Sequence, residues 1–156
     1  MRRLFGLLVA GAIVVLPAFL QDHGTTVFAQ AAPEKTTFTG DMVVWAFAVN
    51  PDKTADYDQV VAKLKDALSK SERPEAKQQL AGWKVMKNAA AQPDGSILYV
   101  HVINPVIPDA DYSIVNIVYE VFKDPAEQVA FYDTYRGALK AALFLIQGPM
   151  TSDFSK

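Results

Sequence analysis

Short uninterrupted apolar runs alternate along the chain with longer stretches in which apolar residues recur every three or four positions. The clearest run is MVVWAFAV at 42–49, which is rich in β-branched and aromatic residues and lies between Gly40-Asp41 and Asn50-Pro51. Its length and its flanks favour a buried strand over a helix. Two further runs, at 83–88 and 96–103, are separated by a loop with Pro-Asp-Gly turn chemistry. These two runs predict a β-hairpin.

Helical spacing occupies the remaining stretches. Apolar residues recur at intervals of three and four between 57 and 68, and a second, short helix is expected from Ser71 to Gly82. A third helix is expected over about 113–122. A fourth begins after Asp124, with Pro125 in its first turn. We predict that this last helix continues to Ile146 and stops at Gly148-Pro149, with a fourth strand at 142–146 as the alternative.

Two segments repeat the same order of residues. VNPDKTADYDQVV starts at Val49 and INPVIPDADYSIVNIV starts at Ile103, and each gives a strand end, Asn-Pro, Ala-Asp-Tyr and a helix. The element order is therefore βα–ββ–α, with two similar βα units, which predicts a single α+β domain over 41–148. A flexible lead-in at 30–40 precedes this domain, and a tail at 149–156 follows it. Local turn chemistry is the alternative reason for the repeat, because Asn-Pro ends strands and Asp caps helices.

This order of elements resembles the ferredoxin-like, or split βαβ, arrangement, and within it the dimeric α+β barrel superfamily, over residues 41–146. That superfamily includes cofactor-free monooxygenases, isomerases and binding proteins. The resemblance implies a three- to four-stranded sheet with helices on one face. It also implies that strands 42–49 and 96–103 are central, adjacent and parallel, and that two subunits pair sheet to sheet. No catalytic motif accompanies it.

The first 29 residues have the pattern of a secretory signal peptide. Arg2 and Arg3 precede an uncharged apolar stretch at 4–20, and small residues follow around 27–31. We therefore expect an exported protein, periplasmic or secreted, with no membrane association after cleavage. A retained membrane anchor is the alternative, although the apolar stretch is at the lower limit for spanning a bilayer and contains Pro17.

Composition excludes several classes of protein. Residues 31–156 contain 13 basic and 16 acidic side chains, a formal charge of −3, which gives no electrostatic basis for binding nucleic acid. The absence of cysteine excludes disulfides, thiolate metal sites and cysteine nucleophiles. Phosphate-binding glycine loops, HExxH and dinucleotide fingerprints are also absent, and we expect no cofactor.

The two faces of the predicted sheet differ in character. Alternation places Trp45, Phe47, Tyr99 and His101 on one face and small aliphatic residues on the other. We expect the helices to cover the aliphatic face. The aromatic face would then be free to form a homodimer interface or to line a pocket for a small apolar ligand.

His101 is the only histidine beyond the signal peptide. A lone histidine in a strand is either a hydrogen-bonded core or interface residue, or the polar group of an otherwise apolar active site. One histidine without cysteine does not supply a usual zinc site. The leading hypothesis is an exported binding or structural homodimer. A small cofactor-free enzyme with His101 as its catalytic candidate is the alternative.

Acidic residues gather at both repeated turns, and they suggest a second alternative. If strands 42–49 and 96–103 were parallel neighbours, the carboxylates would lie along one rim, where they could bind calcium. The competing explanation is helix capping and compensation of the helix dipoles. The candidates are Asp52, Asp56, Asp58, Asp109 and Asp111.

Overall fold

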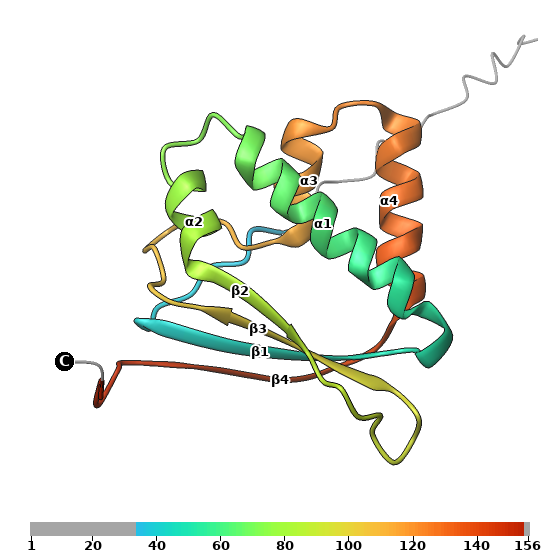
Figure 1. Ribbon diagram of the computed structural model, residues 1–156. Helices are drawn as coiled ribbons and strands as arrows, with labels where there is room; N and C mark the ends of the chain where they lie inside the picture. Colours follow the sequence, from blue (N-terminus) through green and yellow to red (C-terminus); the bar gives the residue numbers. More distant parts are fainter. Residues whose placement is uncertain (1–33, 155–156) are drawn as a thin grey trace, which may run out of the picture. The chain divides into compact units, whose positions relative to one another are not determined.

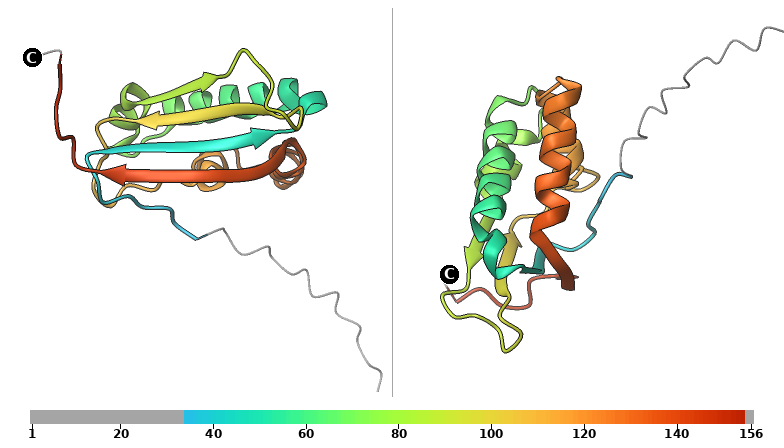
Figure 2. Two further views of the ribbon diagram at one scale, coloured as in Figure 1. Left: turned by 90° about the horizontal axis from the view of Figure 1, so that it is seen from below. Right: turned by 90° about the vertical axis from the view of Figure 1, so that its right-hand side faces the viewer.

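The computed structural model describes residues 34–154, which form an α+β domain with one sheet (Figure 1). The sheet has the order β2-β3-β1-β4, and all neighbouring strands are antiparallel. The helices lie together on one face of the sheet, as the view from below in Figure 2 shows. The predicted α+β class is confirmed. The strands are β1 (Met42–Val49), β2 (Trp83–Lys87), β3 (Ile97–Ile103) and β4 (Leu139–Gly148); the helices are α1 (Thr54–Lys70), α2 (Ala76–Gly82), α3 (Ile114–Val121) and α4 (Pro125–Ala138), with a 3-10 turn η1 (Pro51–Lys53) before α1.

The predicted signal peptide, residues 1–29, lies outside the described residues. Of the lead-in, residues 34–40 are described, and they contact the domain. The side chain of Phe38 is buried, Thr36 N–H donates to Asp111 Oδ1 at 2.9 Å, and Tyr112 N–H donates to Thr36 O at 2.7 Å. The segment that we expected to be flexible therefore packs against the turn that precedes α3.

The two central strands are antiparallel, so the expectation of parallel neighbours was wrong. Val43 of β1 lies opposite Ile103 of β3, and Val49 lies opposite Ile97. The reason is the number of reversals between the strands. The crossover through α1 and α2 keeps β2 in the direction of β1, and the hairpin then reverses the chain once more before β3.

The sequence repeat corresponds to an approximate internal two-fold relation. Asn50, after β1, donates its backbone N–H to Ala138 O at the junction of α4 and β4, at 3.0 Å. Asn104, after β3, donates in the same way to Gly82 O at the junction of α2 and β2, also at 3.0 Å. Each repeated asparagine therefore ties the end of a central strand to the start of an edge strand in the other half of the domain.

The predicted helix over 142–146 was wrong, because α4 ends at Ala138 and β4 follows at once. Pairing with β1 along its whole length provides β4 with backbone hydrogen-bond partners that a longer helix would not gain from the sheet. The stretch AALFLIQ at 141–147 has too few polar residues to distinguish a period of 3.6 from a period of 2. Tertiary pairing decided the conformation of this segment.

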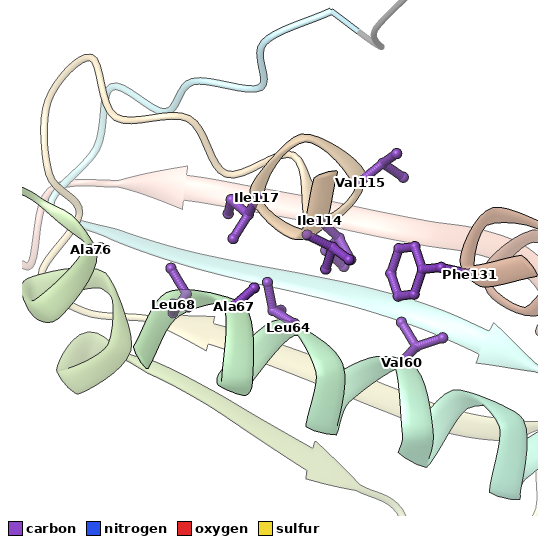
Figure 3. Close-up of a cluster of buried hydrophobic side chains, with 10 residues drawn as sticks. Val60, Leu64, Ala67, Leu68, Ala76, Ile114, Val115, Ile117 and Phe131 are labelled. Carbon is purple, nitrogen blue, oxygen red and sulfur yellow. The ribbon is translucent and has the colours of Figure 1, made fainter. Parts of the chain in front are cut away.

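The apolar core has two parts. One lies among the helices, where side chains of α1 and α3 point toward each other and Phe131 of α4 joins them (Figure 3). The other lies over the sheet, where Val43 and Ile103 pack with Phe38 of the lead-in and Tyr112 of the turn before α3. Val49 packs there with Tyr57 of α1. The helices, the lead-in and the turn before α3 therefore cover one face of the sheet.

Gly40 provides a test of how β4 is held. A Cβ atom at this position would lie 2.4 Å from the backbone nitrogen of Gly148 at the end of β4, so the two backbones would have to separate. We expect Gly40→Ala to destabilise the domain by about 1–3 kcal/mol, measured by urea unfolding. Gly137→Ala, where a Cβ would meet nothing within 4 Å, is the matched control and should be neutral or stabilise by up to ~1 kcal/mol. Equal stability of Gly40→Ala and the wild type would contradict the close approach of residues 40 and 148.

Candidate functional site

The four aromatic-face residues do lie together, but beneath the helices. Trp45 lies opposite His101, and Phe47 lies opposite Tyr99, across β1 and β3. Tyr57 of α1 covers them, with its ring centroid 4.7 Å from that of Tyr99 and 6.1 Å from that of His101. Phe47, Tyr99 and His101 are buried, and Trp45 is half-buried. The aromatic face is therefore neither a free dimer surface nor an open pocket.

Alternation along a strand assigns side chains to faces but does not say which face the helices cover. Both faces of this sheet are apolar, so the choice depends on packing. The aromatic face can be buried because its polar atoms find partners within the layer. That condition is met at Tyr99 and at His101.

His101 forms hydrogen bonds through both ring nitrogens. Its Nδ1 lies 3.0 Å from Trp83 Nε1, and its Nε2 lies 3.0 Å from the Tyr57 hydroxyl. Since an indole N–H can only donate, the hydrogen-bond network assigns the bare nitrogen to Nδ1, and Nε2–H then donates to the Tyr57 oxygen. Burial lowers the pKa of His101 to about 4, so the ring is neutral at physiological pH.

This geometry describes a core histidine. Its side chain is 0% exposed, and neither ring nitrogen is free to meet a substrate. The enzyme alternative needs an accessible imidazole that gains or loses a proton near pH 7. No observation favours that role for His101.

Tyr99 closes the other end of this layer. Its hydroxyl donates to Asp58 Oδ1 at 2.6 Å, and Lys87 Nζ donates to Asp58 Oδ2 at 2.9 Å. Burial, followed by the hydrogen bond to Asp58, raises the pKa of Tyr99. Burial alone would raise the pKa of Asp58, but the hydrogen bonds from Tyr99 and Lys87 lower it. Asp58 is therefore a partner of the aromatic layer and not part of a cation rim.

The predicted acidic rim does not exist. Asp52 and Asp56 follow the C-terminal end of β1, and Asp109 and Asp111 follow the C-terminal end of β3. Because the two strands are antiparallel, their C-terminal ends lie at opposite ends of the sheet. Six residues of strand separate them, which is about 20 Å. Within residues 34–154, no three histidine or acidic side chains gather that could hold a metal ion.

Two of these carboxylates already have partners of their own. Asp56 pairs with Lys53 at 3.1 Å. Asp111 accepts hydrogen bonds from Thr36 N–H and Ser113 N–H at 2.9 Å and from Asn116 Nδ2 at 2.8 Å. Helix capping was the competing explanation for the acidic turns, but the side chain that accepts from the first turn of α3 is Ser113.

The surface that the chain leaves open is the aliphatic face of the sheet, which no helix covers (Figure 2, left). We call it the open sheet face. At its paired positions the one charged side chain is Lys84, on edge strand β2. Its apolar members are Met42, Val44, Ala46 and Ala48 of β1, Met86 of β2, Leu98, Val100 and Val102 of β3, and Ala141, Phe144 and Ile146 of β4.

Edge strand β4 is exposed on both faces: Phe144 and Ile146 extend the open sheet face, whereas Leu145 lies opposite Trp45 on the other face. Leu143 is 48% exposed, Phe144 46%, Leu145 41% and Ile146 63%. An exposed edge strand normally carries charges or a bulge that discourage pairing. β4 has register irregularities opposite Ala46–Phe47 and Ala48–Val49, but residues 141–147 include no charge. This uncharged run was the signal in the sequence for an exposed apolar strand, and helical spacing obscured it.

Comparisons with known proteins give no assignment: no family model matches this chain, and no curated protein or solved structure matches it significantly. Within residues 34–154, no helix has the length and apolarity needed to cross a membrane. The open sheet face is thus the feature of the domain that calls for a functional explanation.

Proposed function

We propose that this protein is an exported binding or structural domain that acts as a homodimer, with the open sheet faces of two copies packed against each other. The observation that carries the proposal is a sheet face built from aliphatic side chains, without helical cover, that continues into the exposed residues of β4. Monomeric proteins rarely keep a contiguous apolar patch of this kind in water.

A second copy suits this face because a two-fold axis places the same patch against itself. The paired positions of the open sheet face hold no acidic side chain, and Lys84 is on the edge strand, so two copies meet without like charges at the centre. Ala46, Ala48 and Val100 at that centre are small and are already buried within one copy, so the area that a partner can cover comes from the larger side chains around them.

The size of the face bounds the strength of the dimer. Four strands about 4.8 Å apart and about seven residues long cover roughly 450 Å² in projection. The accessible area of a corrugated surface exceeds its projection, and the exposed side chains of β4 add to it. Each partner therefore contributes roughly 450 Å² in projection, about half of the roughly 800 Å² per partner of a standard interface, so we expect a dimer at the weak end of the range.

Two sequence-based expectations accompany the proposal. The resemblance to the dimeric α+β barrel superfamily implies sheet-to-sheet pairing, and here the aliphatic face takes the place that we first gave to the aromatic face. The signal peptide implies that the dimer acts in the periplasm or outside the cell.

A charge at the centre of the interface tests the proposal. Val44 lies on β1 within the open sheet face, and Val129 is 55% exposed on α4, on the helical side of the domain. We expect Val44→Glu to convert a wild-type dimer into a folded monomer, because two glutamates would meet in an apolar interface. Val129→Glu, the matched control, should remain a dimer. Sedimentation velocity gives the mass, and circular dichroism checks that each variant is folded.

A wild-type domain that is monomeric over the whole accessible concentration range would overturn the proposal. So would a dimer that persists unchanged in Val44→Glu. In the second case the same experiment on Ile146→Glu would show whether copies pair through the edge of β4 instead.

A further inference from the structure

A groove lies on the helical side of the domain, between α1 and edge strand β2. Its volume is about 410 Å³, within the roughly 300–1,000 Å³ range of sites for small molecules. α1 contributes Val61, Leu64 and Leu68, and Leu80 of α2 and Val85 of β2 complete an apolar lining. The groove is on the other side of the sheet from the open sheet face, and Lys84 of edge strand β2 is the one residue that belongs to both surfaces.

Trp83 joins this groove to the buried layer of the domain. It lines the groove, it is half-buried, and its indole N–H is held by His101 Nδ1. The ring is therefore fixed in place rather than free to collapse into the groove. A wall held in this way keeps the groove formed in the absence of a ligand, which lowers the cost of ordering on binding.

The charges at the groove have a single sign. Lys65 and Lys84 are among the lining residues, and no acidic side chain is. Both lysines are exposed, and in the described part of the chain neither forms a salt bridge that neutralises it. This is a local excess of positive charge in a domain whose formal charge is −3. An apolar floor with uncompensated lysines is complementary to a molecule that has an apolar body and an anionic head.

We propose that the groove between α1 and β2, lined by Val61, Leu80, Trp83 and Val85 with Lys65 and Lys84, binds a small amphipathic organic anion such as an alkyl carboxylate. The hydrocarbon chain lies against the apolar side chains, and the carboxylate is neutralised by lysine ammonium groups. This site differs from the proposed dimer interface in every lining residue except Lys84, which alternation along β2 places on the open sheet face.

The test measures binding of dodecanoate to the full mature protein by titration calorimetry, alongside dodecanol and dodecylammonium. We expect dodecanoate to bind with micromolar to submillimolar affinity and dodecylammonium at least tenfold more weakly. Replacing both lysines, in Lys65→Ala with Lys84→Ala, should weaken dodecanoate binding about threefold to tenfold and leave dodecanol nearly unchanged. Lys77→Ala, an exposed lysine of α2 that does not line the groove, is the matched control and should bind normally.

Ala81→Trp fills the groove from an exposed position and should reduce dodecanoate binding at least tenfold without unfolding the domain. Binding that survives Ala81→Trp but is lost in Val44→Glu would place the ligand on the open sheet face and overturn this proposal. Failure of dodecanoate to bind, or equal binding of dodecanoate and dodecylammonium, would also overturn it. Titration calorimetry measures ligand binding, whereas sedimentation velocity measures the mass of the protein in solution. A failure of the ligand proposal can therefore be told apart from a failure of the homodimer proposal.

Discussion

Between pH 7 and pH 4, the folded domain should lose about 3 kcal/mol of unfolding free energy through His101 alone. The pKa of this histidine is about 4 in the folded domain because burial disfavours the charged ring, and it returns to about 6.5 when the chain unfolds. Protonation would also break the hydrogen bond in which Nδ1 accepts from Trp83. Each unit of difference in pKa corresponds to about 1.4 kcal/mol.

The sign follows from proton uptake. Between pH 6.5 and pH 4 the unfolded chain binds a proton at His101 that the folded domain does not, so acid favours unfolding. The contribution of His101 is complete above pH 6.5 and is lost as pH falls to 4. The pKa of Asp58 is lowered from an ordinary value of 3.8, so its contribution to the unfolding free energy is lost only as the pH falls below that value.

His101→Gln isolates this contribution, because glutamine does not titrate. We expect the variant to be less stable than the wild type at pH 7 and the difference to shrink by about 3 kcal/mol at pH 4, in urea unfolding at one fixed protein concentration. A difference that stays constant with pH would contradict a neutral, buried imidazole. If the variant does not fold, NMR of the wild-type ring nitrogens at pH 5 decides the matter, since we expect a neutral ring with its proton on Nε2.

Asp111→Ala should destabilise the domain by about 2–3 kcal/mol, even though Asp111 lies in a turn. Its carboxylate accepts three hydrogen bonds, which tie the lead-in at Thr36 to the start of α3 at Ser113 and Asn116. Hydrogen bonds to a charged group contribute more than neutral ones, and loss of this acceptor leaves two backbone N–H groups without their partner. Partial exposure of the site keeps the expected cost below the sum of three buried bonds.

Asp52→Ala is the control for this prediction, because Asp52 is an exposed carboxylate in the corresponding turn after β1. We expect a change within ~0.5 kcal/mol. Thermal and urea unfolding compare the two variants, and limited proteolysis shows whether residues 34–40 are released only in Asp111→Ala. If the two aspartates proved equivalent, the role of Asp111 in holding the lead-in would be wrong.

Local features of the fold were predictable, but the direction of β3 relative to β1 and the pairing of β4 with β1 were not. The apolar runs located β1, β2 and β3, and Asp124 caps α4 as expected by accepting from Ala126 and Glu127 N–H. The parallel pairing of β1 and β3 was an error of topology, and it produced the acidic rim as a second error. The direction of a strand depends on how many times the chain reverses before it, which no local residue pattern records.

The candidate site shows the same division. Alternation along β1 and β3 correctly placed Trp45, Phe47, Tyr99 and His101 side by side, because side chains at every second position share a face. It could not show that Tyr57 and Trp83 would complete the hydrogen bonds of His101, since these residues come from α1 and β2, 44 and 18 positions away. Those two contacts are what make the aromatic face suitable for the interior.

The sequence by itself determined the α+β class, most element boundaries and the membership of each sheet face, because these depend on the spacing of apolar residues within a few turns or strand positions. Only the tertiary structure decided which face the helices cover, that residues 139–148 form an edge strand, and that the acidic turns lie at opposite ends of the sheet. These properties depend on contacts between segments far apart in the chain. When both faces of a sheet are apolar, the helices cover the face whose polar atoms find hydrogen-bond partners in the helical layer, and the other face is left open.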